Sequence, residues 1–477
     1  MGSFSREILL IEPPYKVKYP PLGLMKIATY HKMRGDQVTF AKGCLPELQF
    51  QEWDRVYVSS LFTYYWRDTV KTIRYYQSVV SHPSEVVVGG VLATLMKDEL
   101  EAETGARVIP GLLDRPGMLD PGDRSIVDAL VPDYSILDGC NHVYKLKDSF
   151  IAYATRGCPR RCSFCAVHRI EPRFADYIPL RRQVRLIEQL YGPKRDLILL
   201  DNNVLASECF PRIIKDIKAL GFERGAEYTY RAESGRLTTV KRYVDFNQGL
   251  DARLLSEDRM AMLSEIAMKP VRIAFDDIKL RDLYESRVRL AARYRMKYLS
   301  NYVLYNYEDH PDELYERLSI NVALNEELGL QIFSFPMRYA DLRSKDRCVS
   351  TPGNVGPHWN PKYLRAIRCI LIKTRGLVGT KKDYFEAAFG KNSDEYHRIL
   401  LMPEDYIVNR RQHKDDGSTD SWWTQVCSLT ESERDLFRSI VLSNQFGRVQ
   451  YAELPRSVRA ALSHYLVRDR RKKKKLS

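Results

Sequence analysis

The sequence lacks the long apolar runs and the leader pattern that would tie the chain to a membrane. No run approaches the roughly 18 apolar residues of a membrane-spanning helix. Residues 1–14 lack the basic start and the small-residue cleavage site of a secretory signal. Internal repeats of fixed period are also missing, and the one low-complexity segment is a terminal lysine run. We therefore expect a cytoplasmic protein with no membrane partner.

Cysteine is scarce and unevenly spread, with nine residues in 477. In a reducing cytosol, such residues serve more often as metal ligands, catalytic groups or small buried side chains than as disulfides. Three of the nine lie within eight residues, at Cys158, Cys162 and Cys165. The isolated cysteines, among them Cys369 and Cys427, are expected to be buried or incidental thiols.

The bulk composition is that of an ordinary globular chain, with 44% hydrophobic and 29% charged residues. At roughly 100 to 200 residues per domain, the length predicts two to four domains. The formal net charge is +14, which favours polyanionic partners. Much of this charge lies in residues 468–477, so we expect either a nucleic-acid contact through a basic tail or a solvated tail.

Short apolar runs alternate with helical patterns near the amino terminus. This alternation predicts a doubly wound parallel sheet, covered on both faces, over residues 1–110. Residues 111–148, which are rich in Pro, Gly and Asp, are expected to form a linker. The predicted strands are residues 7–12, 37–41, 55–59, 85–88 and 106–109, with helices over 22–34 and from about 90 to 103.

A second series of strand and helix patterns covers residues 149–345 and predicts a full or partial (β/α)6 barrel. The alternation is then lost, and residues 346–467 are expected to form a small, mostly helical domain before the tail at 468–477. Its predicted helices are 362–373, 431–442 with a capping box at Thr430 and Glu433, and 456–470. The predicted barrel strands are 150–155, 197–201, 244–248, 272–275, 298–305 and 331–336.

The segment Cys158-Pro-Arg-Arg-Cys162-Ser-Phe-Cys165 places three thiols in one loop after the first predicted barrel strand. Thiolates are soft ligands for iron–sulfur clusters and for zinc, and a four-iron cube held by three cysteines leaves one iron without a protein ligand. A tetrahedral zinc site that adds His168 is the alternative.

The spacing of Cys158, Cys162 and Cys165, with an aromatic residue at Phe164, resembles the signature of the radical S-adenosylmethionine (SAM) superfamily. The resemblance implies a [4Fe-4S] cluster on the three cysteines, with SAM bound at the open iron and Phe164 near the cofactor. It also implies cleavage of SAM to a 5′-deoxyadenosyl radical for C–H activation, with an electron donor such as flavodoxin or ferredoxin.

Polar residues follow the later barrel strands, at the rim where barrel enzymes place their sites. The resemblance implies that these residues bind the cofactor, although Asp201-Asn202-Asn203 replaces the usual Gly-Gly-Glu. Helix capping and turn formation are the alternative for each residue. Asp276 is also a catalytic candidate, as is the thiol of Cys348 just past the last strand. The predicted cofactor-binding residues are Phe164, Asp201, Asn202, Gln248, Asp251, Arg253, Asp276 and Asn306.

Three stretches near the amino terminus, residues 19–28, 34–38 and 86–90, resemble the cobalamin-binding-type domain that precedes the barrel in one class of these enzymes. With the barrel, the resemblance covers about residues 5–345. The Asp-x-His-x-x-Gly signature for a histidine on cobalt is absent from residues 1–148. Corrin binding and a purely structural cap on the barrel therefore both stay open.

The function predicted by these observations is a radical SAM enzyme, with or without cobalamin-dependent methylation. A nucleotide, a peptide and a small metabolite are all compatible as substrates. The alternative outside enzymology is a zinc-stabilised nucleic-acid-binding protein that uses the cysteine loop and the basic tail. That alternative leaves the polar loops at the strand ends unexplained.

Overall fold

The computed structural model describes residues 5–351 and 353–466. The chain divides into two compact units. The first contains Met1–Ala274, Ser286–Leu299 and Asp341–Arg347, and the second contains Phe275–Glu285, Ser300–Ala340 and Cys348–Ser477. The division into five segments expected from the sequence (1–110, 111–148, 149–345, 346–467 and 468–477) stays a prediction.

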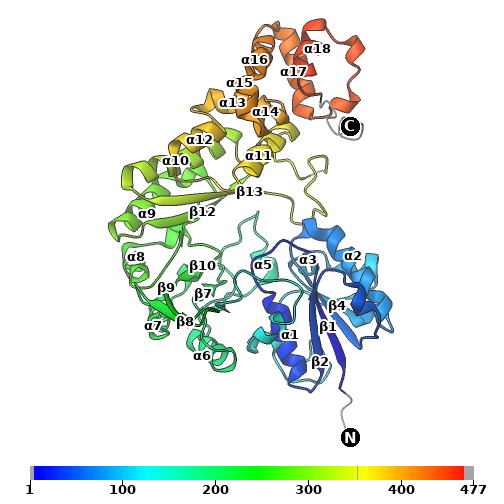
Figure 1. The fold of residues 1–477 in the computed structure, drawn as a ribbon, viewed down its shortest axis with the longest axis vertical. Helices are drawn as coiled ribbons and strands as arrows, with labels where there is room; N and C mark the ends of the chain where they lie inside the picture. Colours follow the sequence, from blue (N-terminus) through cyan, green and yellow to red (C-terminus); the bar gives the residue numbers. More distant parts are fainter. Residues whose placement is uncertain (1–4, 352, 467–477) are drawn as a thin grey trace. The chain divides into compact units, whose positions relative to one another are not determined.

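A five-stranded parallel sheet forms the amino-terminal part of the first unit (Figure 1). Its order is β2-β1-β3-β4-β5, that of flavodoxin-like doubly wound sheets, so the strand order reverses between β1 and β3. The five strands predicted before residue 110 are confirmed. They are β1 (Glu7–Glu12), β2 (Gln37–Lys42), β3 (Arg55–Ser60), β4 (Val86–Gly90) and β5 (Arg107–Val108).

Both faces of this sheet are covered, which explains why its strands are continuous apolar runs rather than alternating ones. Val58 and Val88 pack in one core cluster with Ile73 of a covering helix. The single helix predicted up to residue 103 is wrong, because Met96 leaves the helical region at φ −134° and ψ 44° and separates two helices. The covering helices are α1 (Leu22–Lys32), α2 (Trp66–Tyr76), α3 (Val91–Leu95) and α4 (Lys97–Thr104).

The expected linker, residues 111–148, is irregular apart from two 3-10 turns. It is nonetheless held to the sheet by charge. Asp120 accepts hydrogen bonds from Arg55 at 2.8 Å, from the Tyr30 hydroxyl at 2.9 Å and from Arg6 at 3.2 Å. The segment is therefore a strap over the domain rather than a loose connection.

A second parallel sheet of order β10-β7-β6 lies in the first unit. Its strands are β6 (Ser149–Ala152), β7 (Asp196–Leu199) and β10 (Val244–Phe246). The helices of this region are α5 (Val167–Ile170), α6 (Leu180–Tyr191), α7 (Phe210–Ala219), α8 (Glu257–Ser264) and α9 (Arg281–Arg293).

Several predicted barrel strands are shorter than expected. The strand predicted over 150–155 ends at Ala152, because the next residues turn toward the end of β7, as described below. The strand predicted over 272–275 is reduced to β11 (Val271–Arg272). An antiparallel hairpin of β8 (Glu227–Arg231) and β9 (Leu237–Lys241) was not predicted. No residue of these two strands is buried, so the hairpin has no core-facing stripe for hydrophobic periodicity to detect.

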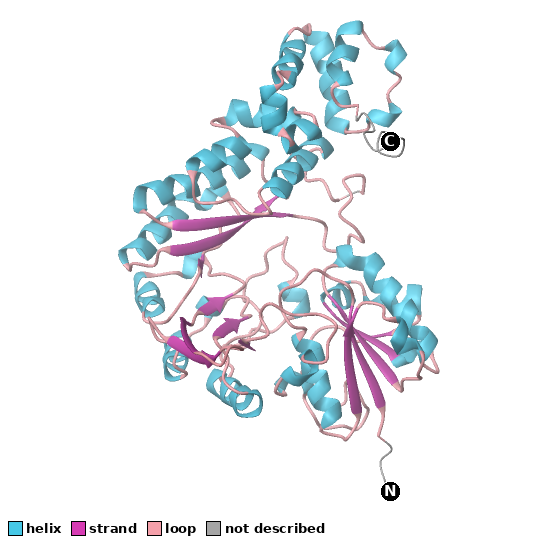
Figure 2. Cartoon of the chain, in the orientation of Figure 1, coloured by secondary structure: helices cyan, strands magenta, loops and turns pink. Residues whose placement is uncertain are grey.

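The second unit contains most of β12 (Tyr298–Tyr305) together with β13 (Gln331–Arg338), neighbours in a further sheet and joined by α10 (Pro311–Leu328). Figure 2 shows helices and no strand in the described residues after β13. The expected helical character of this region is confirmed. Its helices are α11 (Pro361–Lys373), α12 (Lys382–Phe389), α13 (Ser393–Leu401), α14 (Glu404–Val408), α15 (Arg410–Asp415), α16 (Ser418–Cys427), α17 (Glu431–Ser443) and α18 (Arg456–Ser463).

The predicted capping box is present, with Thr430 and Glu433 bonded reciprocally at the start of α17. The helix predicted to begin at Arg456 ends at Ser463, and the part of that prediction beyond Leu466, with the basic tail, lies outside the described residues. Trp422, Phe437 and Leu462 are buried in one core that joins α16, α17 and α18. In the described ranges, no helix is both long and apolar enough to span a bilayer.

Candidate functional site

The cysteine loop begins where β6 leaves its sheet, and Asp201 holds that starting point. Its carboxylate accepts hydrogen bonds from the Ala154 amide at 3.0 Å and from the Thr155 hydroxyl at 2.7 Å, and the Thr155 amide also donates to it. Asp201 is 1% exposed, and burial raises the pKa of its carboxyl to about 6. Asp201 therefore ties the end of β6 to the end of β7; its cofactor role stays a prediction.

The buried carboxylate of Glu171 binds the next two residues of the loop, Arg156 and Gly157. It accepts hydrogen bonds from the Gly157 amide at 2.6 Å, from Arg156 Nη1 at 2.8 Å and from Asn202 Nδ2 at 2.8 Å. Glu171 and Arg156 are each 8% exposed, so this ion pair is buried, where hydrogen bonds must replace lost hydration. Asn202, predicted to bind the cofactor, thus contacts the carboxylate that holds the loop.

Gly157, directly before the first cysteine, is required for steric reasons. Its φ is +72°, in the left-handed region that favours glycine. A Cβ there would lie 2.5 Å from the carbonyl oxygen of Arg173 and 3.0 Å from that of Glu171. The backbone at Gly157 therefore packs directly against the backbone of Glu171 and Arg173. This close contact fixes the direction in which the cysteine loop leaves β6.

The three thiols are all partly buried, and none is in a disulfide. Cys158 Sγ accepts hydrogen bonds from the Arg160 amide at 3.4 Å and from Asn203 Nδ2 at 3.5 Å. The Cys165 amide donates to the Cys162 carbonyl at 3.0 Å, which closes a turn between the second and third cysteines. Phe164, in the same turn, is half-buried.

Asn203 was not among the predicted site residues. It is 4% exposed, and its Oδ1 is buried with no hydrogen-bond partner among the described residues. The only sequence signal was its place in the polar run after β7. The buried Nδ1 of His168, the possible zinc ligand, likewise has no partner there.

The three thiols of the cysteine loop are chemically suited to bind an iron–sulfur cluster. Within residues 5–351 and 353–466, no three His, Cys, Asp or Glu side chains are gathered closely enough to hold a metal ion. The three thiols nevertheless share one loop, and one of them accepts a side-chain N–H. Cysteine ligation with N–H groups on the sulfurs is the usual protein environment of an iron–sulfur cluster. The residues therefore fit a cluster in type.

The loop that follows β10 carries the next group of predicted residues. Asp251 accepts from Arg253 Nε at 2.7 Å and caps a 3-10 turn, so the Arg253 fork pairs with a carboxylate of its own loop. Arg160 of the cysteine loop lies 3.8 Å from Asp251. Gln248 is exposed, whereas its neighbour Asn247 is buried and accepts from the Tyr19 hydroxyl. The β10 loop and the cysteine loop are thus in contact through charge.

The remaining predicted residues belong to the second unit. Asn306 is fully buried with φ +68°, and its amide donates to the Tyr339 and Asn354 carbonyls at 2.9 and 3.0 Å. The backbone oxygen of Asp276 accepts from Arg317 at 2.9 Å. Cys348 is exposed, with Sγ 2.9 Å from Ser350 Oγ. Asn306 therefore organises local backbone, and the predicted cofactor and catalytic roles of all three stay predictions.

The amino-terminal sheet has a candidate ligand edge of its own. Open sheets of this class bind ligands beyond the carboxyl ends of the strands where the order reverses, which here means β1 and β3. Tyr15 and Tyr65 lie there with ring centroids 4.5 Å apart, and Tyr64 packs on Tyr65 at 4.8 Å. His31 is buried between Asp36 at 2.6 Å and the Tyr57 hydroxyl at 3.0 Å, so it belongs to the core.

Neither a protein-family model nor a curated protein matches the chain. Among solved structures, the chain is similar to the radical SAM methyltransferase TsrM from Kitasatospora setae, solved with its tryptophan substrate and a SAM analogue, aza-SAM, bound. The identity is 14%, 77% of each chain is covered, and the TM-score is 0.49.

Proposed function

We propose that the chain is a radical SAM enzyme in which Cys158, Cys162 and Cys165 hold a [4Fe-4S] cluster. The observation that carries the proposal is the spacing of these cysteines, with Phe164, on a loop directly after β6. When bound with SAM, such a cluster supplies a 5′-deoxyadenosyl radical for attack on a substrate C–H bond. Thiolate ligands need a reducing compartment, so the proposal places the enzyme in the cytosol, with a small electron-transfer protein as donor.

The side chains around the loop position it. Asp201 and Glu171 hold its first residues through buried hydrogen bonds, and Asn203 donates to the sulfur of Cys158. These contacts support a preorganised loop, because they tie it both to the run after β7 and to the segment after α5. We infer that Phe164, Asn202, Gln248, Asp251 and Arg253 line the cofactor. Asp276, Asn306 and Cys348 keep the roles predicted from the sequence: cofactor contact for Asp276 and Asn306, and catalysis for Asp276 and Cys348.

The proposal includes two finer points of architecture. We infer that β6, β7, β10, β11, β12 and β13 are strands of a partial (β/α)6 barrel, supported by the parallel pairing of the first three and by the helices between successive strands. For the amino-terminal sheet, corrin binding and a structural cap both remain in the proposal. Because His31 is buried in the core, it is not a candidate ligand for cobalt.

Anaerobic reconstitution tests the proposal. The full chain is loaded with iron and sulfide, reduced with dithionite and incubated with SAM. We expect about four irons and four sulfides per chain, the composition of a [4Fe-4S] cluster, a paramagnetic signal and 5′-deoxyadenosine. Cys158→Ala, Cys162→Ala and Cys165→Ala should each abolish 5′-deoxyadenosine, whereas Cys427→Ala, an exposed thiol at the end of α16, should not.

The metal content of the protein and the products formed from SAM distinguish the possible outcomes. A colourless protein that binds zinc and no sulfide would overturn the enzyme assignment. For the reaction type, the assay is repeated with and without cobalamin. 5′-Deoxyadenosine together with S-adenosylhomocysteine indicates methylation, and 5′-deoxyadenosine alone indicates hydrogen abstraction.

A further inference from the structure

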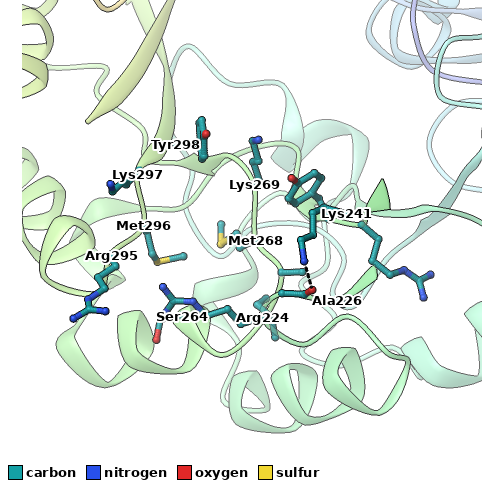
Figure 3. Close-up of a pocket in the computed structure, with 15 residues that line it drawn as sticks. Arg224, Ala226, Lys241, Ser264, Met268, Lys269, Arg295, Met296, Lys297 and Tyr298 are labelled. Carbon is teal, nitrogen blue, oxygen red and sulfur yellow. Dashed lines mark hydrogen bonds between the residues drawn. The ribbon is translucent and has the colours of Figure 1, made fainter. Parts of the chain in front are cut away.

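A cavity lined by many polar and charged residues lies in the first unit (Figure 3). Tyr243 directly precedes β10 and Lys269 lies two residues before β11, so the cavity is built at the amino ends of these strands. The cysteine loop instead follows the carboxyl end of β6, which runs parallel to β7 and β10. The cavity has a volume of about 170 Å³, and Ile266, Ala267 and Met296 form its buried apolar part.

The charge of the cavity is of one sign. Six cationic side chains line it and no carboxylate does. Within the described residues, Lys241 alone among the six forms a salt bridge, to Glu227 at 2.7 Å. Like charges brought together without counter-charges repel one another, and a cleft lined by one sign concentrates ions of the other. The six are Arg224, Lys241, Arg242, Lys269, Arg295 and Lys297.

Neutral groups hold two of these cations in place, and the carboxylates of Asp196, Glu188 and Glu223 also act on one of the two, Arg242. The Lys269 ammonium lies 3.9 Å from the ring centroid of Tyr298 and 4.8 Å from that of Tyr243. Arg242 donates to the carbonyls of Lys194 at 2.8 Å and Arg195 at 3.0 Å. Lys269 and Arg242 are therefore positioned before any anion arrives, which lowers the entropy cost of binding one. The other four cations are exposed.

The unpredicted hairpin begins at the cavity rim and carries two tyrosines, of which Tyr228 has its ring centroid 5.8 Å from Cζ of Arg242. Its first pair, Glu227 and Lys241, joins β8 and β9 at the cavity rim. Further along β8, the rings of Tyr228 and Tyr230 stack with centroids 5.9 Å apart, and Tyr230 is 40% exposed. Exposed rings next to cationic side chains are the usual combination for a base next to its phosphate.

We propose that this cavity binds the phosphate group of a nucleotide or of a nucleic-acid strand. Lysine and arginine supply several donors and positive charge to phosphate oxygens. The volume is several times the roughly 30 Å³ of a water molecule in the liquid, which leaves room for a phosphate. The site is separate from the cysteine loop and does not depend on a cluster there.

Binding measurements on the full chain test the proposal. The probes are pyrophosphate and ATP, followed by calorimetry, and a fluorescein-labelled 12-nucleotide single strand, followed by anisotropy. The variant Lys269→Gln/Lys297→Gln should weaken binding by about tenfold or more, the loss expected for charged hydrogen bonds. Lys269→Arg/Lys297→Arg should retain most of the affinity, and higher salt should weaken it.

The control is Lys215→Gln, which removes one charge from the exposed face of α7, outside the cavity. The basic residues 468–477 are the same in every variant, so their contribution cancels. Sensitivity of pyrophosphate or ATP to the cavity variant assigns a free nucleotide; sensitivity of the oligonucleotide alone assigns a strand. Absence of binding by all three probes, or an equal loss in Lys215→Gln, would overturn the proposal.

Discussion

Asn203 donates a hydrogen bond from Nδ2 to Sγ of Cys158 across 3.5 Å, and so joins the polar run after β7 to the first thiol of the cysteine loop. The opposite side of the same amide, Oδ1, is buried without a partner in the part of the chain that the structure describes. A buried polar atom left in this state costs about 1 to 3 kcal/mol. Because this amide lies beside a candidate metal ligand, Asn203 is a further candidate residue of the site.

Removal of this N–H should change the reconstituted cluster electronically. Hydrogen bonds to ligand sulfurs stabilise the more negative, reduced state. We therefore expect Asn203→Ala to lower the midpoint potential while iron content is retained. A redox titration followed by electron paramagnetic resonance measures this, with Asn409→Ala in the second unit as the control. An unchanged potential in Asn203→Ala would show that the hydrogen bond does not act on a ligand.

Gly157 and Gly235 provide a matched pair of glycines. Both have positive φ, +72° and +81°, but a Cβ at Gly235 meets nothing within 4 Å, whereas at Gly157 it meets backbone at 2.5 Å. We expect Gly235→Ala to cost about 1 to 2 kcal/mol of unfolding free energy for the backbone conformation alone. Gly157→Ala should cost roughly 1 to 3 kcal/mol more from overpacking. Urea unfolding measures both, and equal losses would refute the close contact at Gly157.

Asp201 should make stability depend on pH. Its pKa is raised to about 6 in the folded chain from 3.8, so its stabilising contribution is complete below about pH 4 and is lost as pH rises through 6. The difference between these two pKa values corresponds to at most about 3 kcal/mol of unfolding free energy. The unfolding free energy of the natural chain minus that of Asp201→Asn should therefore fall between pH 4 and pH 7. Urea unfolding at four pH values checks this, and a flat difference would contradict the burial of an ionisable carboxyl.

Glu171 and Glu265 each form a salt bridge, but in different surroundings. The Glu171–Arg156 pair is buried, whereas the Glu265–Lys218 pair is exposed, with an N–O distance of 2.6 Å. Removal of one partner from a buried pair costs about 3 to 5 kcal/mol where it leaves the other charge unpaired. Arg156 keeps Asp128 at 2.9 Å, so we expect a smaller cost here, whereas removal from an exposed pair costs less than about 1 kcal/mol. We expect Glu171→Gln to destabilise the first unit accordingly and to lower iron retention, with Glu265→Gln as control. Similar losses in the two variants would mean that Glu171 does not hold the loop.

The elements that the sequence predicted well are those with a strong local pattern. The apolar runs of β1, β3 and β4 and the capping box at Thr430 depend on neighbours within a few residues, and all are confirmed. Prediction was weaker where one residue ends an element. Met96 divides a helix that its side chain would allow to continue, and β6 stops at Ala152 because the following amides bond to Asp201.

The hairpin and the cationic cavity were not predicted, for a related reason. The residues of β8 and β9 are all at least partly exposed, including Tyr228, Tyr230, Leu237 and Val240, so their pairing depends on backbone hydrogen bonds rather than on a buried stripe. The six cations of the cavity come from four separate stretches of the sequence, between Arg224 and Lys297. Only folding brings them together, because electrostatic clustering depends on distance in space and not along the chain.

The cysteine loop itself was predicted from the order of residues, since thiols on one loop are necessarily close in sequence. The partners of that loop were not, since Asp201, Glu171 and Asn203 reach it from other segments of the chain. A short-range pattern specifies which atoms a segment offers, whereas buried hydrogen bonds are satisfied by whichever groups the packed core brings within about 3 Å. Tertiary packing alone therefore decided which polar side chains support the thiols.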